Sequence, residues 1–101
     1  MEKRKPHYDL AAVQSAVRLR GADAFTATAL IGAQAIGLDA AQGIDVVCGM
    51  TRADFYKSMT THASSQVWQD VYHAEVPSGK VACVKVTLRE DGSVVIQFKE
   101  R

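Results

Sequence analysis

The hydrophobic pattern of this chain changes its period after Gly49, and that change restricts the fold more than any other feature. Before it, apolar residues recur at helical spacing. After it, four segments alternate with the period of two that half-buried strands require: FYKSMTT (55–61), QVWQDVYHAEV (66–76), KVACVKVTL (80–88) and SVVIQFK (93–99). Helices followed by strands predict an α+β fold, in which an antiparallel sheet of four to six strands packs against about three N-terminal helices.

Capping residues and glycines delimit the predicted helices. They run over residues 9–20, 26–37 or 28–37, and 39–49, each opened by a capping type and closed at a glycine. Residues 22–26 are expected to form a short strand or a turn. The opening MEKRKPHY predicts an extended basic arm, although its charge alone favours a frayed tail.

The register of the last two strands follows from the sequence of their turn. A three-residue loop with Gly92 in the left-handed conformation separates the two faces best. The apolar face then carries Val84, Val86, Leu88, Val94, Ile96 and Phe98. The other face carries Cys83, Lys85, Thr87, Val95, Gln97 and Lys99. A two-residue loop would move Lys85 beside Phe98, so we expect the three-residue loop, which places Cys83 opposite Lys99.

Composition limits the class of protein. The chain has 101 residues, of which 48% are hydrophobic, so we expect one domain over residues 1–101 with its own core. Twelve basic and 11 acidic residues give a net charge of +1, which argues against a protein that coats DNA by charge alone. Nearly equal numbers of basic and acidic residues are compatible with a small enzyme that has a local basic site.

Several features predict a cytoplasmic protein. The two cysteines, Cys48 and Cys83, provide neither a disulfide framework nor a four-ligand zinc site, so reduced thiols are expected. The polar N-terminus does not resemble a signal peptide. No apolar run approaches the roughly 20 residues that span a bilayer, so no membrane association is expected.

The segment DFYKSMTTHASSQVWQDVY (54–72) combines aromatic, lysine, threonine and glutamine side chains on two predicted strands. A segment that served only the core would be mostly Val, Ile and Leu. Phosphates attract cations and unstacked bases attract flat side chains, so this mixture suits single-stranded nucleic acid. Tyrosine and threonine are also common in ordinary strands, so the composition alone does not decide the function.

Four separated segments, in order along nearly the whole chain, resemble the MqsR family of bacterial toxins. They are MEKRKPH at the N-terminus, FYKSMTT (55–61), WQDVY (68–72) and the final FKE (98–100). The segment ALIGAQAIGLD (29–39) is similar to the middle of that family. The resemblance implies a RelE-like, microbial-ribonuclease fold. It also implies a type II toxin that cuts messenger RNA, at short sequences such as GCU, without the ribosome and without a metal or other cofactor.

The same resemblance implies the partners. Family members are neutralised by an antitoxin with a zinc-binding N-terminal domain and a helix-turn-helix domain that binds DNA. The toxin would then meet DNA only through the antitoxin complex, which represses the operon of the pair. A direct DNA-binding regulator is a weaker alternative, because no predicted helix carries a row of basic and amide side chains.

Family site residues are carried over by their motifs. The catalytic candidates are Lys57 from FYKS, Gln69 from WQDV and Lys99 from FKE. The family has a tyrosine after the third turn, whereas GKVACVKV aligns Cys83 with it, or Ala82 after a shift of one. Because this position has no phenol, a second hypothesis is a toxin-like binding module that is catalytically weakened and acts mainly through its antitoxin.

These residues suit RNA cleavage by the neighbouring 2′-hydroxyl. Two lysines beside the phosphate would stabilise the extra negative charge of the transition state, and Gln69 would orient the substrate. Four further residues are expected to contact the RNA: Tyr56, Tyr72, His7 and Lys85. For the two tyrosines a structural role is equally plausible. The spread of the three histidines along the chain suggests no acid–base pair.

Strict alternation raises a difficulty for this site. It places Lys57 on the same face as Phe55 and Met59, and Gln69 on the same face as Val67 and Val71, which are neighbours typical of a core. A β-bulge or an opened sheet edge would turn the lysine toward the RNA. Alternatively, Tyr56, Trp68 and Tyr72 face the RNA and Lys57 is less central.

Overall fold

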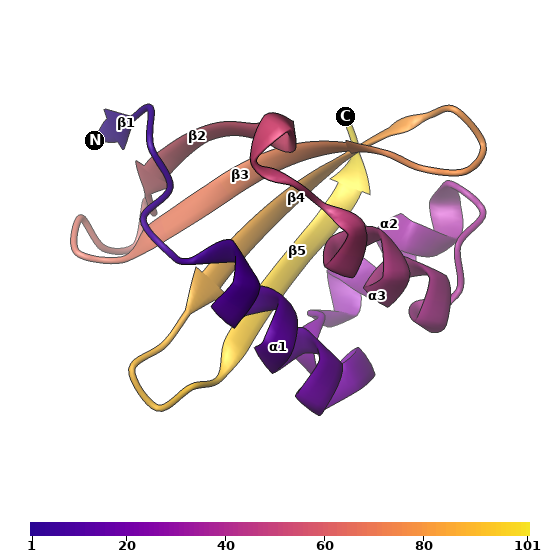
Figure 1. Ribbon diagram of the computed structural model, residues 1–101, viewed down its shortest axis with the longest axis horizontal. Helices are drawn as coiled ribbons and strands as arrows, with labels where there is room; N and C mark the ends of the chain where they lie inside the picture. The colour runs from indigo at the N-terminus through magenta and orange to yellow at the C-terminus, as the bar shows by residue number, and fades with distance from the viewer.

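The computed structural model describes residues 1–101, which form three helices and a five-stranded antiparallel sheet (Figure 1). The strands lie in sequence order across the sheet. They are β1 (Glu2–Lys3), β2 (Phe55–Thr60), β3 (Trp68–Glu75), β4 (Val81–Leu88) and β5 (Val94–Glu100). The predicted α+β architecture is confirmed. No helix is long and apolar enough to cross a membrane.

The three helices begin at the predicted caps. They are α1 (Leu10–Arg20), α2 (Ala27–Ala35) and α3 (Ala40–Gly49). The side chains of Asp9, Thr26 and Asp39 each accept a hydrogen bond from a backbone amide in the first turn. These bonds satisfy donors that have no partner within the helix, which is why short polar residues mark the helix starts in the sequence.

The segment between α1 and α2 forms a 3₁₀ helix (Gly21–Ala24), and a second 3₁₀ helix (Arg52–Asp54) precedes β2. Phe25 then makes a single parallel bridge to Ile96 of β5. The expectation of a turn or a short strand over residues 22–26 is therefore close to what forms.

The β4–β5 hairpin has the predicted register. Cys83 pairs with Lys99 and Leu88 pairs with Val94. The loop closes through Gly92, whose φ of 86° lies in the left-handed region that favours glycine. The three-residue loop is confirmed, and it fixes which side chains of these strands face the helices.

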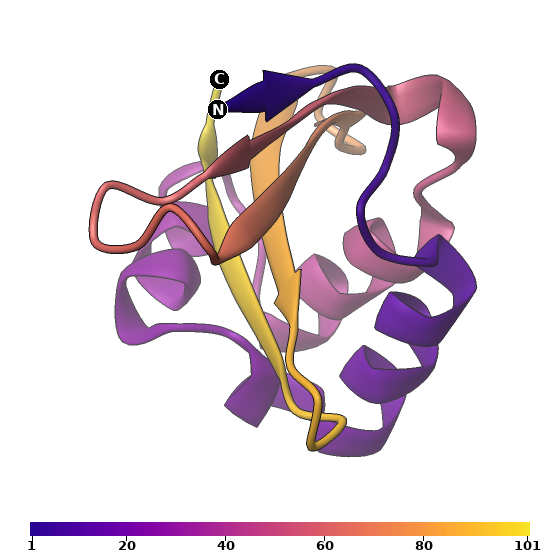
Figure 2. The same ribbon diagram turned by 90° about the vertical axis from the view of Figure 1, so that its left-hand side faces the viewer.

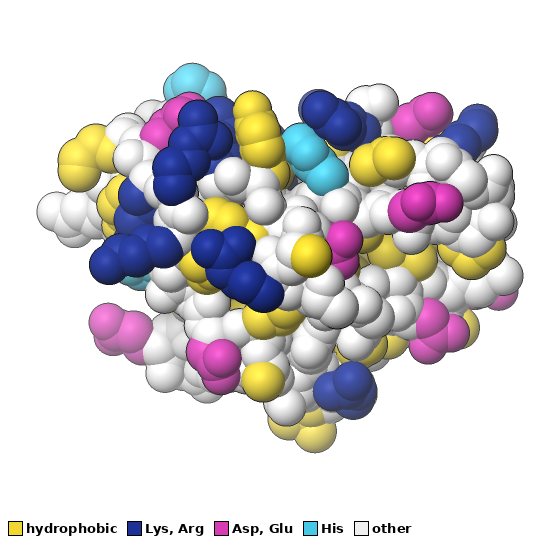
Figure 3. All heavy atoms as spheres, turned by 45° about the horizontal axis from the view of Figure 1, so that its top comes forward, with side chains coloured by type: hydrophobic (Ala, Val, Ile, Leu, Met, Phe, Trp, Pro, Cys, Tyr) yellow, Lys and Arg dark blue, Asp and Glu magenta, His cyan; other side chains and the backbone are white.

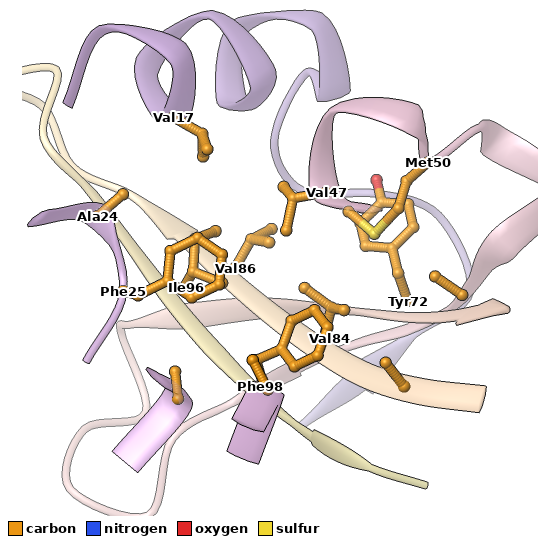
Figure 4. Packing of buried hydrophobic residues seen from close by; sticks show 14 of the residues in the cluster. Val17, Ala24, Phe25, Val47, Met50, Tyr72, Val84, Val86, Ile96 and Phe98 are labelled. Atoms are coloured by element: carbon orange, nitrogen blue, oxygen red, sulfur yellow. The ribbon is translucent and has the colours of Figure 1, made fainter. Parts of the chain in front are cut away.

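The helices cover one face of the sheet, and the core lies between them (Figures 1 and 2). Val84, Val86, Ile96 and Phe98 extend from the sheet into a cluster of 19 buried residues. Figure 4 shows that Val17, from α1, and Val47, from α3, point toward these strand residues. The other face of the sheet has no helix packed over it.

Helix α2 packs along β5, the last strand of the sheet. The backbone amide of Thr26, just before α2, donates a hydrogen bond of 3.1 Å to the carbonyl oxygen of Ile96. At Gly32 an added Cβ would collide with the carbonyl oxygen of Phe98, so only glycine permits this approach. The small residues of α2 therefore let its backbone reach the strand.

The N-terminal arm is paired with the sheet, so the expectation of a frayed tail is wrong. Glu2 and Lys3 form β1 against Met59 and Ser58 of β2. The carboxylate of Asp70, which is fully buried, accepts hydrogen bonds of 2.9–3.0 Å from the backbone amides of His7 and Tyr8. A buried carboxylate requires such donors, and here the arm supplies them.

Candidate active site

The sheet face opposite the helices, here called the open face, gathers most of the predicted site residues. Strand pairing defines its two central rows. One row runs Lys57, Val71, Lys85 and Gln97 across β2 to β5. The other runs His73, Cys83 and Lys99 across β3 to β5. Gln69 lies two residues before Val71 on β3, so its side chain points to the same face.

A β-bulge in β2 resolves the alternation difficulty. Phe55 pairs with Tyr72, but Lys57 pairs with Val71, so Tyr56 is the extra residue of the bulge. Phe55 consequently faces the helices, whereas Lys57 faces away from them, although the two would share a face in a regular strand. Of the two ways to turn Lys57 outward, the structure has the bulge.

Lys57 is held by an acidic partner from the arm. Its Nζ lies 2.6 Å from Oε2 of Glu2, and its side chain retains 21% exposure. A direct hydrogen bond from the Lys57 ammonium lowers the pKa of the Glu2 carboxyl, and the charge of Lys57 adds to this effect. The pair orients the ammonium beside the ring of Tyr56, whose centroid is 5.5 Å from Nζ.

Lys57 and Lys99 share the open face but stand on strands separated by three spacings, about 14 Å between backbones. Lys85, His73 and Cys83 occupy the surface between them. Lys99 is exposed and forms no ion pair. The two lysines therefore border a common surface.

Hollows border this surface on the β5 side. One of about 420 Å³ is lined by Cys83, Lys85, Gln97 and Lys99, together with residues at the start of α2. A second of about 490 Å³ reaches from Gln97 to Gln69 and on to the arm. Gln97 lines both hollows, so they adjoin on the open face and are together called the depression. Figure 3 shows Lys and Arg side chains gathered toward the end of the molecule where β1 and β2 lie.

Tyr56 is exposed and lies over the site. Its ring stacks on His73, with centroids 4.5 Å apart and planes at 23°. The guanidinium carbon of Arg4 lies 5.9 Å from the same ring. A flat face beside cationic groups is the arrangement on which unpaired bases stack.

Tyr72 does not reach this surface, so the expectation that it contacts RNA is wrong. It is 1% exposed, it faces the helices, and its ring packs edge-on against Phe55. Burial raises the pKa of its phenol to about 12. The strand alternates strictly here, which places Tyr72 on the face opposite to Gln69 and His73.

His7 and Trp68 form a separate aromatic group at the arm. Their rings stack with centroids 5.3 Å apart, and Nζ of Lys3 lies 4.2 Å from the Trp68 ring. The same Nζ lies 2.8 Å from Nδ1 of His7. Burial and, to a lesser degree, the Lys3 charge lower the pKa of His7. His7 thus borders the depression near Gln69 and is distant from Lys99 in the sheet order.

His73 is the residue that sequence reasoning missed. It is half-buried on the open face, next to Cys83 in register. Burial, and then the charge of Arg101, lower the pKa of its imidazole. A signal was available, because His73 follows Gln69 by four residues on a strand and therefore shares its face. No three residues of the types that bind metal ions converge anywhere in the chain.

Comparison with known proteins identifies the family of this chain. Residues 5–100 match the family model described as "Motility quorum-sensing regulator, toxin of MqsA". The chain is also 40% identical over 101 residues to the mRNA interferase toxin MqsR of Escherichia coli (strain K12), with 100% of both chains covered. The resemblance inferred from four short segments is confirmed, and the chain belongs to the MqsR toxin family.

Proposed function

We propose that this protein is a type II toxin that arrests growth by cutting single-stranded mRNA at short sequences. The observation that carries the proposal is that Lys57 of β2 and Lys99 of β5 lie on one exposed face of the sheet with Gln69. The relative of known activity, an mRNA interferase toxin, is similar over its full length. The cleavage triplet is expected to resemble GCU.

The proposed chemistry is transesterification within the RNA. The 2′-oxygen attacks the adjacent phosphorus and the bond to the 5′-oxygen breaks, which leaves a 2′,3′-cyclic phosphate and a 5′-hydroxyl. The ammonium groups of Lys57 and Lys99 stabilise the additional negative charge of the phosphorane, and neither needs a metal ion or cofactor to do so. The amide of Gln69 positions the substrate within the depression.

The RNA strand is expected to run across the open face. Tyr56 offers an exposed ring for base stacking, since its other face already lies on His73. Lys85 stands between Lys57 and Lys99, here called the two outer lysines, and would contact a phosphate next to the scissile one. His7 would meet the strand where the arm borders the depression.

The protein partner is proposed to be a cognate antitoxin of the MqsA kind, with a zinc-binding domain and a helix-turn-helix domain. Both proteins would act in the cytoplasm, and DNA would be bound only by their complex. Isolated toxin should therefore leave operator DNA unshifted in a gel, whereas the complex should shift it.

Cleavage is tested with purified protein and a single-stranded RNA that contains GCU, in excess EDTA. The native chain should cut, and the product should carry a cyclic phosphate. A Lys57→Ala, Lys99→Ala double variant should lose cutting while it keeps the native circular dichroism spectrum. Lys80→Ala is the matched control, because Lys80 is an exposed lysine in the β3–β4 turn, outside the open face. Undiminished cutting by the double variant refutes the proposed roles.

A weakened, antitoxin-directed binding module is the second candidate, and Cys83 motivates it. If the native chain does not arrest growth but Cys83→Tyr does, the binding-module function is supported. If the native chain arrests growth by itself, that alternative is excluded.

A further inference from the structure

The surface between the two outer lysines carries one imidazole, that of His73. In register it is followed by Cys83 on β4 and Lys99 on β5. On its other side, the ring of Tyr56 stacks on it at 4.5 Å, and the same tyrosine ring lies 5.5 Å from Nζ of Lys57. His73 therefore stands on the open face between the strands that carry Lys57 and Lys99.

Transesterification requires a group that accepts the proton of the 2′-hydroxyl. The ammonium group of a lysine has no free electron pair and cannot accept it. The carboxylate of Glu2 is engaged by Lys57 at 2.6 Å, and this contact lowers its basicity. His7 is bound to Lys3 and stacked on Trp68 at the arm. Glu75 shares the face of His73, but it is the exposed last residue of β3 and lies farther from Lys57. His73 is the half-buried base at the centre of the open face, and its side chain has no hydrogen-bond partner.

We propose that His73 is the general base of the RNA cleavage described above, on which this inference rests. The neutral imidazole takes the 2′-hydroxyl proton as the 2′-oxygen bonds to phosphorus. The bond from phosphorus to the 5′-oxygen then breaks, and the ammonium of Lys99 supplies the proton of the leaving oxygen. The imidazolium finally returns its proton through water to the neutral amine of Lys99, which restores both groups.

The surroundings of His73 favour its neutral form. The titratable and charged groups that face it are Tyr56 and Lys57 on β2, Glu75 on its own strand, Cys83 and Lys85 on β4, and Lys99 and Arg101 at the end of β5. Burial of the imidazole, and then the charge of Arg101, lower its pKa and so oppose proton uptake. A base that is already neutral near pH 7 can act without prior deprotonation.

The test is a pH–rate profile of single-turnover cleavage, with a short GCU-containing RNA in EDTA, from about pH 5 to 9. For the native chain, the rate should rise with pH and reach a plateau through an apparent pKa below the usual 6.5 of histidine. His73→Gln should cut about 10²- to 10⁴-fold more slowly, lose this acid limb and retain its affinity for RNA. His62→Gln is the matched control, because His62 is exposed outside the strands.

A second variant keeps the proposal testable if His73→Gln folds poorly. His73→Ala removes the ring, and added imidazole should restore cutting in proportion to its concentration. The proposal is overturned if a folded His73→Gln protein keeps the acid limb and a rate within a few-fold of native, in which case RNA cleavage itself still stands. If the native chain leaves the RNA intact, the proposed function and this inference both fail.

Discussion

Asp70→Asn is the substitution whose effect can be worked out most fully from the structure. Asp70 is fully buried, and its two oxygens accept the backbone amides of His7 and Tyr8. Asparagine has the same shape but only one accepting oxygen. Placed where Oδ2 of Asp70 lies, that oxygen still accepts from both backbone amides, but as a neutral acceptor. The NH₂ group of the asparagine then takes the place of Oδ1, where it faces the His7 amide donor to donor and has no acceptor.

The size of the loss follows from these two contacts. An N–H group left without an acceptor in a buried site costs about 1–3 kcal/mol, and exchanging a charged acceptor for a neutral one costs about 1 kcal/mol more. The unfolding free energy should fall by about 2–4 kcal/mol, which lowers the Tm of a chain of this length by roughly 10–20 °C. Release of the arm limits the loss, because the introduced asparagine and the arm amides can then bind water.

Thermal unfolding followed by circular dichroism measures this effect, and trypsin measures release of the arm. Lys3 and Arg4 are cleavage sites that pairing with β2 and anchoring at Asp70 should protect. Asp91→Asn is the matched control, because Asp91 also accepts a backbone amide, that of Ser93, but on the exposed β4–β5 loop. If the Asp70→Asn variant has the same Tm as the Asp91→Asn variant, and the arms of both resist trypsin equally, the anchoring argument is wrong.

Three further outcomes are expected. Gly32→Ala should destabilise the fold by several kcal/mol in urea titrations because its Cβ collides with a β5 carbonyl, whereas Gly49→Ala, with nothing within 4 Å, should be neutral or gain up to about 1 kcal/mol. Burial lowers the pKa of His7 below 6.5, so the unfolded chain binds more protons. The contribution of His7 to the free energy of unfolding is complete above pH 6.5 and is lost as the pH falls through the pKa of the folded state. His7→Gln should therefore reduce the drop in the urea midpoint between about pH 7.5 and 5.5. Tyr56→Ala should weaken RNA binding by about 1–3 kcal/mol in fluorescence anisotropy, whereas Tyr72→Phe should not change it.

Much of the fold was predictable because short-range chemistry decided it. The caps Asp9 and Asp39 begin helices by bonding amides only three residues away. The β4–β5 register depends on a three-residue loop and on the separation of apolar from polar faces. The match of Lys57 and Lys99 to family motifs then placed both lysines in the predicted site, and the register of β5 already turned Lys99 away from the core.

Other features depend on contacts between distant parts of the chain. Alternation alone placed Lys57 among core residues, and the bulge at Tyr56 that turns it outward is visible only in its pairing with β3. From the sequence, a core position and an RNA contact were equally good predictions for Tyr72. The structure shows that it lies on the face that the helices cover. Such choices depend on which surface another element buries, and a strand sequence does not specify its neighbour.

The sequence by itself determined the order of helices and strands, the last hairpin and the membership of a toxin family, because these depend on local periodicity, capping and short motifs. Only the tertiary structure decided that the N-terminal arm is anchored on Asp70, 62 residues away from Tyr8, and that His73 stands between the two outer lysines. Both outcomes arise when the sheet closes, since burial of a carboxylate and alignment of strands are properties of the assembled fold.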